Sequence, residues 1–415
     1  METKNKLIIF TFDFPYGNSE QTFIKYELSQ LVKEFDSIHI VNKKKEFNKI
    51  KQKNYSNIFY NDEFSKQLNL KNLFFTLISK IIFTFDYWIE VKNIFLSKKF
   101  FIKLKMLTLE QVNAKILHDF IFKNFDKNDN YIFYSFWSNF VLITFNKIKK
   151  DYPNSKFIAR GLGSDLNGFI INDDYIPNVD KKFNKLDNLI LLGEYQKEIL
   201  ERKKLKINKI NICPIGVYKQ NILDLDIDLK NQKIPLNFVS CGNLIEIKNN
   251  LLMIDFLLKF KSLTNRKINY TLIGNGKMEN KIIDKLKKNQ KFLNYKHIDK
   301  VDNLIEYFKN NRVNFFMNFS SQEGMAFTIM EAMSCGIPII ASNIKPNKFL
   351  INGRGYLFDI YNFDQSISTL IKDIDLDLES KDNYLIKSKN CYEFINKNLV
   401  NEDCFQEFKK VLLNV

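Results

Sequence analysis

Residues 313–342 read VNFFMNFSSQEGMAFTIMEAMSCGIPIIAS, and this stretch decides the fold. A short apolar run ends in a polar loop, a helix-like segment follows, and a second apolar run closes the stretch. Strand, loop, helix and strand in this order are typical of a parallel sheet covered by helices. Gly324 lets the backbone bend toward a ligand, and the N–H groups at the start of the helix suit phosphate.

The same alternation continues on both sides of this stretch. The first half predicts strands at KLIIFTF, SIHIV, YIFYSF, KFIA and NLILL, with a helix at QTFIKYELSQLVKEF. After INICPIGV the pattern restarts, with strands at LNFVSCGN and INYTLIG and helices at NNLLMIDFLLKFKSL and KMENKIIDKLKK. Two α/β halves joined near residue 215 predict a binding cleft between them, because ligands of open α/β sheets bind beyond the carboxyl ends of the strands.

This pattern gives the expected domain organisation. Residues 1–215 are expected to form an N-terminal Rossmann-like domain, and residues 216–392 a C-terminal one. The helical tail at residues 393–415 is expected to pack back on the N-terminal domain. Within the first domain, residues 68–126 form a helical insertion that is rich in Phe and Lys.

Composition and charge narrow the class of protein. With 415 residues, 45% hydrophobic and 27% charged, the chain matches a soluble globular protein of two or three domains. Its net charge of +16 indicates an anionic partner: nucleic acid, an anionic membrane surface or a phosphorylated small ligand. The basic residues are scattered and no nucleic-acid-binding motif accompanies them, so nucleic acid is not expected.

Cysteine and histidine usage points to a cytoplasmic protein without a metal site. The five cysteines lie far apart without a C-x-x-C pair, which fits a reducing compartment. The three histidines are isolated, so neither a metal nor another cofactor is expected. No signal peptide or membrane-spanning helix is predicted. The insertion at 68–126 leaves two interpretations open: it lies on an anionic membrane, or it packs on its own domain with solvated lysines, and the second is preferred.

Glu323 and Glu331 stand eight positions apart. On one helix they would be about 12 Å apart, from the rise of 1.5 Å per residue. This separation is larger than that of the two carboxylates of a glycosidase. It suits two ends of an elongated ligand such as a nucleotide diphosphate sugar. The alternative is a solvent-facing helix glutamate and an ordinary loop residue, which the neighbouring glycine, strand and Lys248 make the weaker interpretation.

The motifs together resemble a known family. EGMAFTIMEAMSCGIPIIAS resembles the E-x7-E signature of the retaining GT-B glycosyltransferases of family four, the glycosyl transferases group 1 set. FPYGNSEQTFIKYEL is similar to the first loop of members that build bacterial surface polysaccharides. ARGLGSDL, LLGEYQKEIL, ICPIGV, VSCGNLIEIKNN, YTLIGNGKMENKI and NGRGYLF follow in the family's order. The resemblance implies a GT-B fold, with two Rossmann-like domains facing each other across a cleft and a C-terminal helix returning to the first. It implies that residues 1–215 form the acceptor domain and that residues 216–392 form the domain that binds a nucleotide sugar.

The resemblance also implies roles for individual residues. Glu331 would bind the ribose of the donor, Glu323 would face the transferred sugar, and Lys248 would neutralise the diphosphate. Asp165 would lie near the acceptor and share the catalytic role with Lys248 and Glu323. The other expected donor-binding residues are Gly324, Met325, Ala326, Phe327, Asn243, Gly17, Gly274, Asn275 and Val301. The expected acceptor-side residues are Arg160 and Ser164.

Two positions depart from the family's pattern. Asn243 stands where the family usually has an arginine, so one of two cations on the diphosphate is missing, and Arg160 or a lysine is expected to compensate. Leu162 stands where the family has a cleft histidine. The leading hypothesis is a metal-independent retaining transferase that moves a sugar from a UDP- or GDP-sugar to a saccharide or lipid-linked acceptor of a bacterial surface polysaccharide. A sugar-nucleotide epimerase is less well supported, and the alternative of another class is a catalytically silent protein that binds a partner or a membrane.

Overall fold

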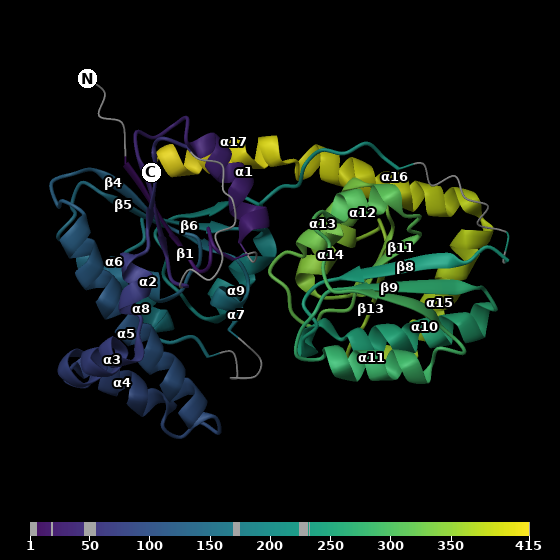
Figure 1. Cartoon of the computed structure of the whole chain (residues 1–415), viewed down its shortest axis with the longest axis horizontal. Helices are drawn as coiled ribbons and strands as arrows, with labels where there is room; N and C mark the ends of the chain where they lie inside the picture. The colour runs from purple at the N-terminus through teal and green to yellow at the C-terminus, as the bar shows by residue number, and fades with distance from the viewer. Residues whose placement is uncertain are drawn as a thin grey trace. The chain divides into compact units, whose positions relative to one another are not determined.

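The computed structural model describes residues 6–17, 20–44, 55–168, 175–223, 231 and 233–414, apart from the side chains of Ser164 and Asn167. The chain divides into two compact units, one formed by Met1–Ile215 and Phe405–Val415, the other by Gly216–Cys404 (Figure 1). Each unit contains one parallel sheet with helices on its faces, so the expected pair of Rossmann-like α/β units is confirmed.

The first unit is built on a seven-stranded sheet in the order β3-β2-β1-β4-β5-β6-β7. Its strands are β1 (Lys6–Thr11), β2 (Ile38–Asn42), β3 (Ile58–Asn61), β4 (Tyr131–Ser135), β5 (Lys156–Gly161), β6 (Asn188–Leu191) and β7 (Ile210–Ile212). Its helices are α1 (Gln21–Leu31), α2 (Glu63–Gln67), α3 (Leu70–Thr76), η1 (Leu77–Ile81), α4 (Phe85–Ile94), α5 (Phe100–Asn124), α6 (Phe140–Ile148), α7 (Ser164–Asn167), α8 (Val179–Lys182), η3 (Glu194–Gln196) and α9 (Lys197–Arg202).

The second unit is built on a six-stranded sheet in the order β10-β9-β8-β11-β12-β13. Its strands are β8 (Leu236–Cys241), β9 (Ile268–Ile273), β10 (Asn294–Ile298), β11 (Phe315–Asn318), β12 (Ile339–Ser342) and β13 (Tyr356–Phe358). Its helices are η4 (Glu246–Lys248), α10 (Asn250–Thr264), α11 (Glu279–Lys288), α12 (Leu304–Asn310), α13 (Phe327–Ser334), α14 (Lys345–Ile351), α15 (Phe363–Glu379) and α16 (Lys381–Asn398), followed by α17 (Asn401–Leu413).

Buried apolar strands explain why these segments form the sheets. In β1 and β4 nearly every residue is buried, because a parallel sheet with helices on both faces leaves no strand face in water. The predicted strands and helices quoted above are all present, and the segment at 68–126 is helical. The sequence did not predict the edge strands β3 (IFYN) and β10 (NYKHI), because both carry polar residues and form no apolar run.

The C-terminal tail is divided between the units. Residues up to Cys404 group with the second unit, because α16 places Cys391 and Ile395 in the core that α13 also lines. Only the part of α17 from Phe405 onward groups with the first unit. There the ring of Phe408 packs against Tyr134, with 5.4 Å between ring centroids. The tail was expected to pack on the first unit from residue 393 onward. In the structure the chain returns to the first unit only at Phe405.

The chain passes between the units twice, and hydrogen bonds join the two passages. Val217 follows the first passage, and its N–H donates to the carbonyl of Leu399 at 2.9 Å. The N–H of Asn401 donates back to the carbonyl of Val217 at 2.9 Å. Gly216 packs so closely here that a Cβ atom would lie 2.5 Å from the backbone nitrogen of Asn401. Glycine is therefore required at this passage for packing.

Candidate functional site

Each sheet contains one point at which the strand order reverses. In the second unit this point lies between β8 and β11, and in the first between β1 and β4. The loops that follow these strands are residues 242–245 and 319–326 in the second unit; in the first they are residues 136–139 and, in the described part, residues 12–17 and 20. Since ligands of open α/β sheets bind at such reversals, ligand-binding groups are expected on these loops in each unit.

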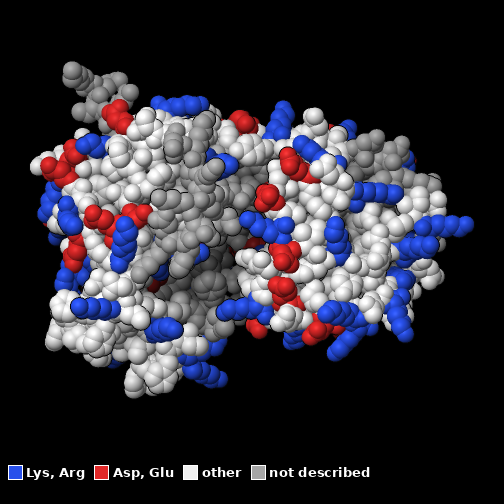
Figure 2. Space-filling model, viewed as in Figure 1, with Lys and Arg blue, Asp and Glu red and all other residues white. Residues whose placement is uncertain are grey.

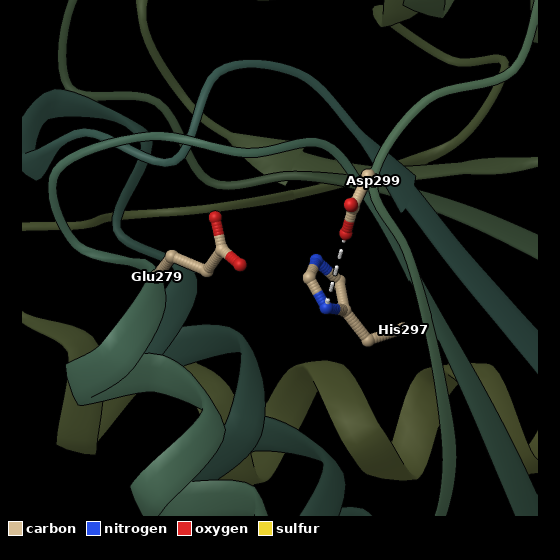
Figure 3. Close-up of side chains that lie close together, drawn as sticks. All are labelled: Glu279, His297 and Asp299. Carbon is tan, nitrogen blue, oxygen red and sulfur yellow. Dashed lines mark ion pairs between the residues drawn. The ribbon is translucent and has the colours of Figure 1, made fainter.

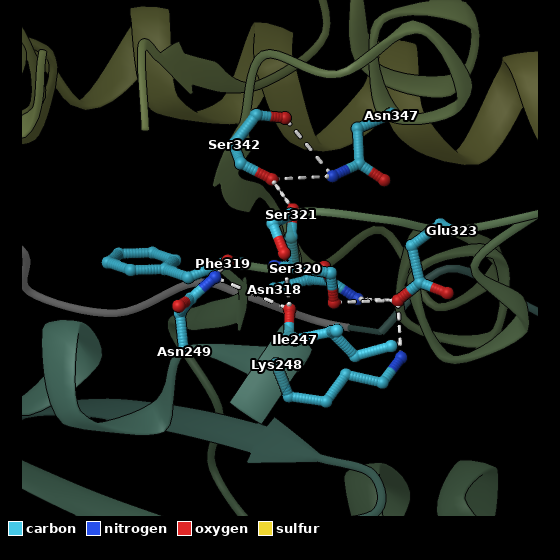
Figure 4. Close-up of polar contacts among 10 residues, drawn as sticks. All are labelled: Ile247, Lys248, Asn249, Asn318, Phe319, Ser320, Ser321, Glu323, Ser342 and Asn347. Atoms are coloured by element: carbon cyan, nitrogen blue, oxygen red, sulfur yellow. Dashed lines mark hydrogen bonds and ion pairs between the residues drawn. The ribbon is translucent and has the colours of Figure 1, made fainter. Parts of the chain in front are cut away.

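Glu323 is held in place by three donors in the second unit (Figure 4). Its Oε1 accepts hydrogen bonds from Lys248 Nζ at 2.5 Å, from Ser320 Oγ at 2.7 Å and from Asn318 Nδ2 at 3.3 Å. All three use the same oxygen, so Oε2 can accept from a ligand hydroxyl. The side chains of Lys248 and Glu323 are 24% and 12% exposed, so this pair is sheltered and still reachable.

Hydrogen bonds between the two loops fix the position of the Lys248–Glu323 pair. The N–H of Ser321 donates to the carbonyl of Ile247 at 2.8 Å, and Asn249 Nδ2 donates to the carbonyl of Phe319 at 3.0 Å. On the other side, Ser342 Oγ donates to the carbonyl of Ser320 at 2.5 Å. A group held by such a network loses little conformational entropy when it binds a ligand.

Glu331 lies on the second turn of α13 and differs in its surroundings from Glu323. Burial raises the pKa of its carboxyl to about 7. No hydrogen bond or ion pair to this carboxylate occurs in the described part of the chain. Burial also raises the pKa of the Cys241 thiol to about 12, and the charges of Glu331 and Lys248 both act on that thiol. Cys241 therefore lies near both charged groups at the end of β8.

The start of α13 completes the set of groups beside β11. The helix begins at Phe327, and the residue before it, Ala326, has no side chain that could cap the N–H groups of the first turn. Gly324 and Met325 lie between Glu323 and this helix start. Partial positive charge from the helix dipole and the ammonium group of Lys248 thus lie on adjacent loops, an arrangement that suits a phosphate.

Glycines bring the loops after β8 and β9 together. Gly274 has a φ of +136°, and a Cβ atom there would lie 2.0 Å from the carbonyl oxygen of Gly242. The carbonyl of Asn275 accepts a hydrogen bond from the N–H of Leu244 at 2.8 Å. Asn243, on the same loop, is exposed. Gly274, Asn275 and Asn243 therefore form one rim beside the Lys248 loop.

Val301 follows β10 and packs, partly buried, against a core cluster. Near it, Glu279, His297 and Asp299 place potential metal-ligand atoms within 4.8 Å of one another (Figure 3). His297 Nε2 lies 2.8 Å from the carbonyl oxygen of Gly274. Because a nitrogen facing a carbonyl must donate, only Nδ1 is left for a metal, and it lies 3.8 Å from Asp299. Metal independence stays a prediction.

A cavity of about 420 Å³ lies at the strand reversal of the first unit. It is lined by Phe12, Lys43, Met106, Glu110, Trp137, Ser138, Asn139, Phe140, Asp165, Gly168, Tyr175, Ile176, Pro177 and Lys182. Lys182 pairs with Glu110 at 2.8 Å. Lys43 lies over the rings of Phe12 and Phe140 at 5.5 and 5.1 Å, and burial lowers its pKa. The cavity thus has aromatic walls and contains the ammonium group of Lys43. Unlike Lys182, Lys43 forms no ion pair within the described residues.

Glu20 organises the first loop beside this cavity. It is fully buried and accepts hydrogen bonds from the N–H groups of Phe12, Asp13 and Phe14, and from Trp137 Nε1. Burial raises the pKa of its carboxyl, and these bonds oppose the rise. A Cβ atom on Gly17 would lie 2.0 Å from Oδ2 of Asp13. Glycine is therefore needed at position 17 for packing within its own loop. The approach of Gly17 to a diphosphate stays a prediction.

Asp165 joins the loops after β4 and β5. Its carboxylate accepts hydrogen bonds from the N–H groups of Ser138 at 2.8 Å, Leu162 at 3.0 Å and Gly163 at 2.7 Å. Burial raises its pKa, and these bonds lower it. Asp165 lines the cavity, and its hydrogen bonds to three backbone N–H groups hold the loops after β4 and β5 together. The side chain of Ser164, expected on the acceptor side, lies outside the described part of the structure.

Arg160 was expected on the acceptor side and as a substitute for the missing arginine at position 243, and this expectation is wrong. Its side chain is fully buried and forms two hydrogen bonds to Glu27, at 3.0 and 2.8 Å. Its guanidinium carbon lies 4.5 Å from the ring centroid of Phe408. It is therefore a core residue that fixes α1 and α17 to the first sheet, and neither an acceptor nor a diphosphate can reach it.

The sequence did not identify several residues that shape the two sites. Asn318, Ser320 and Asn347 support Glu323 and its loop, yet each looks like an ordinary strand-end or helix-start residue. In the first unit, Lys43 and Trp137 line the cavity although they lie far apart in the sequence. The available signal was positional, since Lys43 directly follows β2 and Trp137 lies two residues after β4, and these two strands are the neighbours of β1 in the sheet.

A family model of known proteins matches part of the second unit. Residues 226–390 match the family model described as Glycosyl transferases group 1. A search of curated proteins finds no match. The family match lies within the second unit and covers less than half of the chain.

Solved structures match the fold of the whole chain. The lipopolysaccharide outer core galactosyltransferase WaaB, in its apo form, aligns over 99% of both chains with a TM-score of 0.63 and 13% identity. A glycosyltransferase from Rickettsia africae aligns over 99% of this chain and 98% of its own, with a TM-score of 0.64 and 14% identity. A mutant of S. aureus TarM, in complex with fondaparinux, alpha-GlcNAc-glycerol and UDP, has a TM-score of 0.54 and 17% identity; this chain spans 59% of its length.

Proposed function

Because the chain has the GT-B fold and its residues 226–390 match the Glycosyl transferases group 1 family, we propose that the protein is a retaining glycosyltransferase. It moves a sugar from a nucleotide diphosphate sugar to a saccharide or lipid-linked acceptor in the synthesis of a bacterial surface polysaccharide. The similarity to a lipopolysaccharide galactosyltransferase supports this pathway class. The TarM complex contains UDP, which makes UDP-sugars the first donors to test, followed by GDP-sugars.

One observation carries the proposal: Lys248 and Glu323 form a fixed pair at the strand reversal beside the start of α13. In the proposed complex Lys248 binds the diphosphate, and Glu323 Oε2 accepts a hydrogen bond from a hydroxyl of the transferred sugar. Glu331, farther along α13 and without a protein partner in the described chain, is proposed to accept from the ribose hydroxyls. A carboxylate that lacks a partner in the free protein gains one when the donor binds.

The proposed reaction uses the leaving group as the base. The acceptor oxygen bonds to the anomeric carbon on the face from which the diphosphate departs, and the bond from that carbon to the diphosphate oxygen breaks. The acceptor proton passes to a phosphate oxygen, so the products are a glycoside and a nucleoside diphosphate. Lys248 and the N–H groups at the start of α13 stabilise the charge that grows on the diphosphate. No step requires a metal or another cofactor.

The acceptor is proposed to bind in the cavity of the first unit. Aromatic and aliphatic walls suit a sugar ring face or an isoprenoid-like chain, and Lys43 suits an anionic group. We place the enzyme in the cytoplasm, in peripheral contact with the inner face of the cell membrane, where such acceptors are found. No helix in the described residues has the length and apolarity to cross a membrane.

A second candidate is a catalytically silent protein that binds a partner or a membrane. Asn243 and Leu162 favour it. Asn243 stands where the family usually has an arginine, and Arg160, buried against Glu27, does not compensate. Leu162 stands where the family has a histidine.

A nucleotide-sugar screen separates the two candidates. Thermal unfolding is followed with a panel of UDP- and GDP-sugars, because a ligand that binds only the folded state raises the midpoint. A donor that stabilises the wild type should not stabilise Glu331→Ala, whereas Glu306→Ala, an exposed helix residue of the same unit, should respond like the wild type. Release of the nucleoside diphosphate from that donor supports the enzyme. Binding without release or transfer supports the silent protein, and no binding to any donor rejects the proposal.

A further inference from the structure

The helices α3, η1, α4 and the start of α5 expose an unusual amount of apolar surface. Thirteen of the twenty-three exposed large apolar side chains in the described chain lie between Leu70 and Leu109. They are Leu70, Phe74, Phe75, Ile78, Phe83, Phe85, Trp88, Ile89, Phe95, Leu96, Phe101, Ile102 and Leu109. Scattered exposed apolar residues are normal, but a group of this size concentrated on consecutive helices indicates an interaction site. We call this group the apolar lobe.

The apolar lobe is not a loosely packed core. Helices η1 and α4 also have an inward face, where Ile81, Tyr87, Val91 and Ile94 are buried against the core of the first unit. Helix α4 therefore has two apolar faces, and the outer one carries Phe85, Trp88 and Ile89 at helical spacing. The inner face accounts for folding, and the outer face needs another occupant. In Figure 1 these helices project from the sheet of the first unit as a separate layer.

The charges of the lobe indicate what the occupant is. Residues 70–109 contain Lys71, Lys80, Lys92, Lys98, Lys99, Lys103 and Lys105, and only two acidic residues before Glu110, namely Asp86 and Glu90. Both acids bind the body of the unit: Asp86 pairs with Lys181 at 2.7 Å, and Glu90 accepts from the hydroxyl of Tyr175 at 3.0 Å. In Figure 2 the lobe, at lower left, is mostly white with separate blue residues.

Lysines and apolar side chains share the same outward stripes. On α4, Lys92 follows Trp88 and Ile89 at spacings of four and three residues. On α5, Lys105 lies between Phe101 and Leu109, four residues from each, so all three face the same way. A protein partner would leave these ammonium groups without carboxylates to bind unless its own surface were acidic. An anionic lipid surface accepts both kinds of side chain at once, with rings below the headgroups and ammonium groups among the phosphates.

We propose that the apolar lobe lies on an anionic membrane surface, with the outer faces of α3, η1, α4 and the start of α5 inserted at headgroup depth. Trp88 is the central anchor. It is 55% exposed, and its indole Nε1 donates to the carbonyl of Ile82 at 2.6 Å, which fixes the ring in the outer face. This contact does not depend on glycosyl transfer, and it assigns a surface to the peripheral location proposed above.

The test is flotation of the purified full-length chain with lipid vesicles. The wild type should float with vesicles rich in phosphatidylglycerol and much less with pure phosphatidylcholine, and added salt should weaken the binding. Replacing Leu70, Phe85, Leu96 and Phe101 with Gln should reduce the floated fraction at least about tenfold. These residues are among the most exposed of the lobe, so the substitutions should leave the fold intact. A matched control replaces four exposed apolar residues of the second unit, Phe292, Tyr361, Leu376 and Ile386, with Gln and should float like the wild type.

A second pair of variants tests the lysines. Replacing Lys71, Lys92, Lys98 and Lys105 with Gln should lower binding to phosphatidylglycerol vesicles. The control replaces four equally exposed lysines of the second unit with Gln and should bind like the wild type; these are Lys281, Lys287, Lys288 and Lys291. Brominated lipids should quench tryptophan fluorescence in the wild type. That quenching should be lost in Trp88→Phe, which still floats.

Three results would overturn the proposal. The wild type does not float with anionic vesicles; or the apolar variant floats as well as the wild type; or the wild type is a dimer that the apolar variant converts to monomers without a change in flotation. The last result would assign the lobe to a second copy of the chain. Nucleotide-sugar binding, measured without vesicles, is unaffected by any of these outcomes, so failure of the membrane contact and failure of the transferase proposal are separable.

Discussion

The ammonium group of Lys248 and the carboxylate of Glu323 lie 2.5 Å apart, although 75 positions separate them in the chain. The first follows the strand β8 and the second follows β11, the two neighbours at which the sheet order reverses. In the free protein the pair holds a cation and an anion ready at one position. A bound diphosphate would offer Lys248 a second anion, and a sugar hydroxyl would occupy the free oxygen of Glu323.

Lys248→Met should abolish most of the transfer activity. Removing one preorganised charge from a transition state typically costs a factor of about 10² to 10³ in kcat. The midpoint of thermal unfolding should change little, because the pair is partly exposed and contributes at most modestly to stability. Lys291→Met, an exposed lysine of the same unit, is the control. Normal transfer by Lys248→Met would remove the residue from the mechanism.

Glu331→Gln should stabilise the free protein at alkaline pH. Burial raises the pKa of this carboxyl from 4.5 to about 7, so the folded state binds the proton more tightly than the unfolded state. Its stability is therefore greatest below about pH 4.5 and falls as the pH rises through 7, by on the order of 3 kcal/mol. Glutamine does not ionise and avoids this loss. The gain in unfolding midpoint over the wild type should be clear at pH 8 and shrink toward pH 4.5, and a gain independent of pH would contradict this explanation.

Gly274→Ala should destabilise the second unit more than Gly353→Ala. Both glycines have positive φ values, +136° and +72°, but only at Gly274 would the new Cβ meet another group, the carbonyl oxygen of Gly242 at 2.0 Å. Backbone strain alone costs about 1 kcal/mol, and the collision should raise the loss to about 2–4 kcal/mol. Thermal unfolding of both variants checks this, and equal losses would show that the loops after β8 and β9 can separate.

Arg160→Met should destabilise the first unit by about 3–5 kcal/mol, because it leaves Glu27 buried without its partner. The double variant Arg160→Met with Glu27→Leu should recover much of that loss, since neither charge then remains. Denaturant unfolding of the two single variants and the double variant measures the coupling. A stable Arg160→Met protein with a raised KM for the acceptor would return Arg160 to the acceptor side.

Lys43→Met should raise the KM for an anionic or lipid-linked acceptor by about tenfold, since a charge-assisted hydrogen bond contributes roughly 1.5 kcal/mol or more. Slow hydrolysis of the donor in the absence of acceptor should not change, because Lys43 lies in the first unit. Lys66→Met, an exposed lysine of α2, is the matched control. A change in donor hydrolysis without a change in acceptor KM would place the acceptor elsewhere.

The sequence predicted the central strands and the loop and helix that follow β11, because buried parallel strands are apolar runs and the glycine, glutamate and helix follow one of them directly. Edge strands such as β10 lacked that signal. The misassignment of Arg160 has a similar cause: its partner Glu27 lies 133 positions away, and only the folded sheet brings them together. The cavity of the first unit was out of reach because its walls come from segments distributed between Phe12 and Lys182.

The bridge between Val217 and Val400 has a mechanical consequence. The two covalent passages between the units, after Ile215 and after Cys404, both lie within a few residues of this bridge. The bridge itself belongs wholly to the second unit. The first and last segments of the second unit are thus held by each other, because Val217 bonds to Leu399 and Asn401. Loss of either segment would leave the other without its backbone partner.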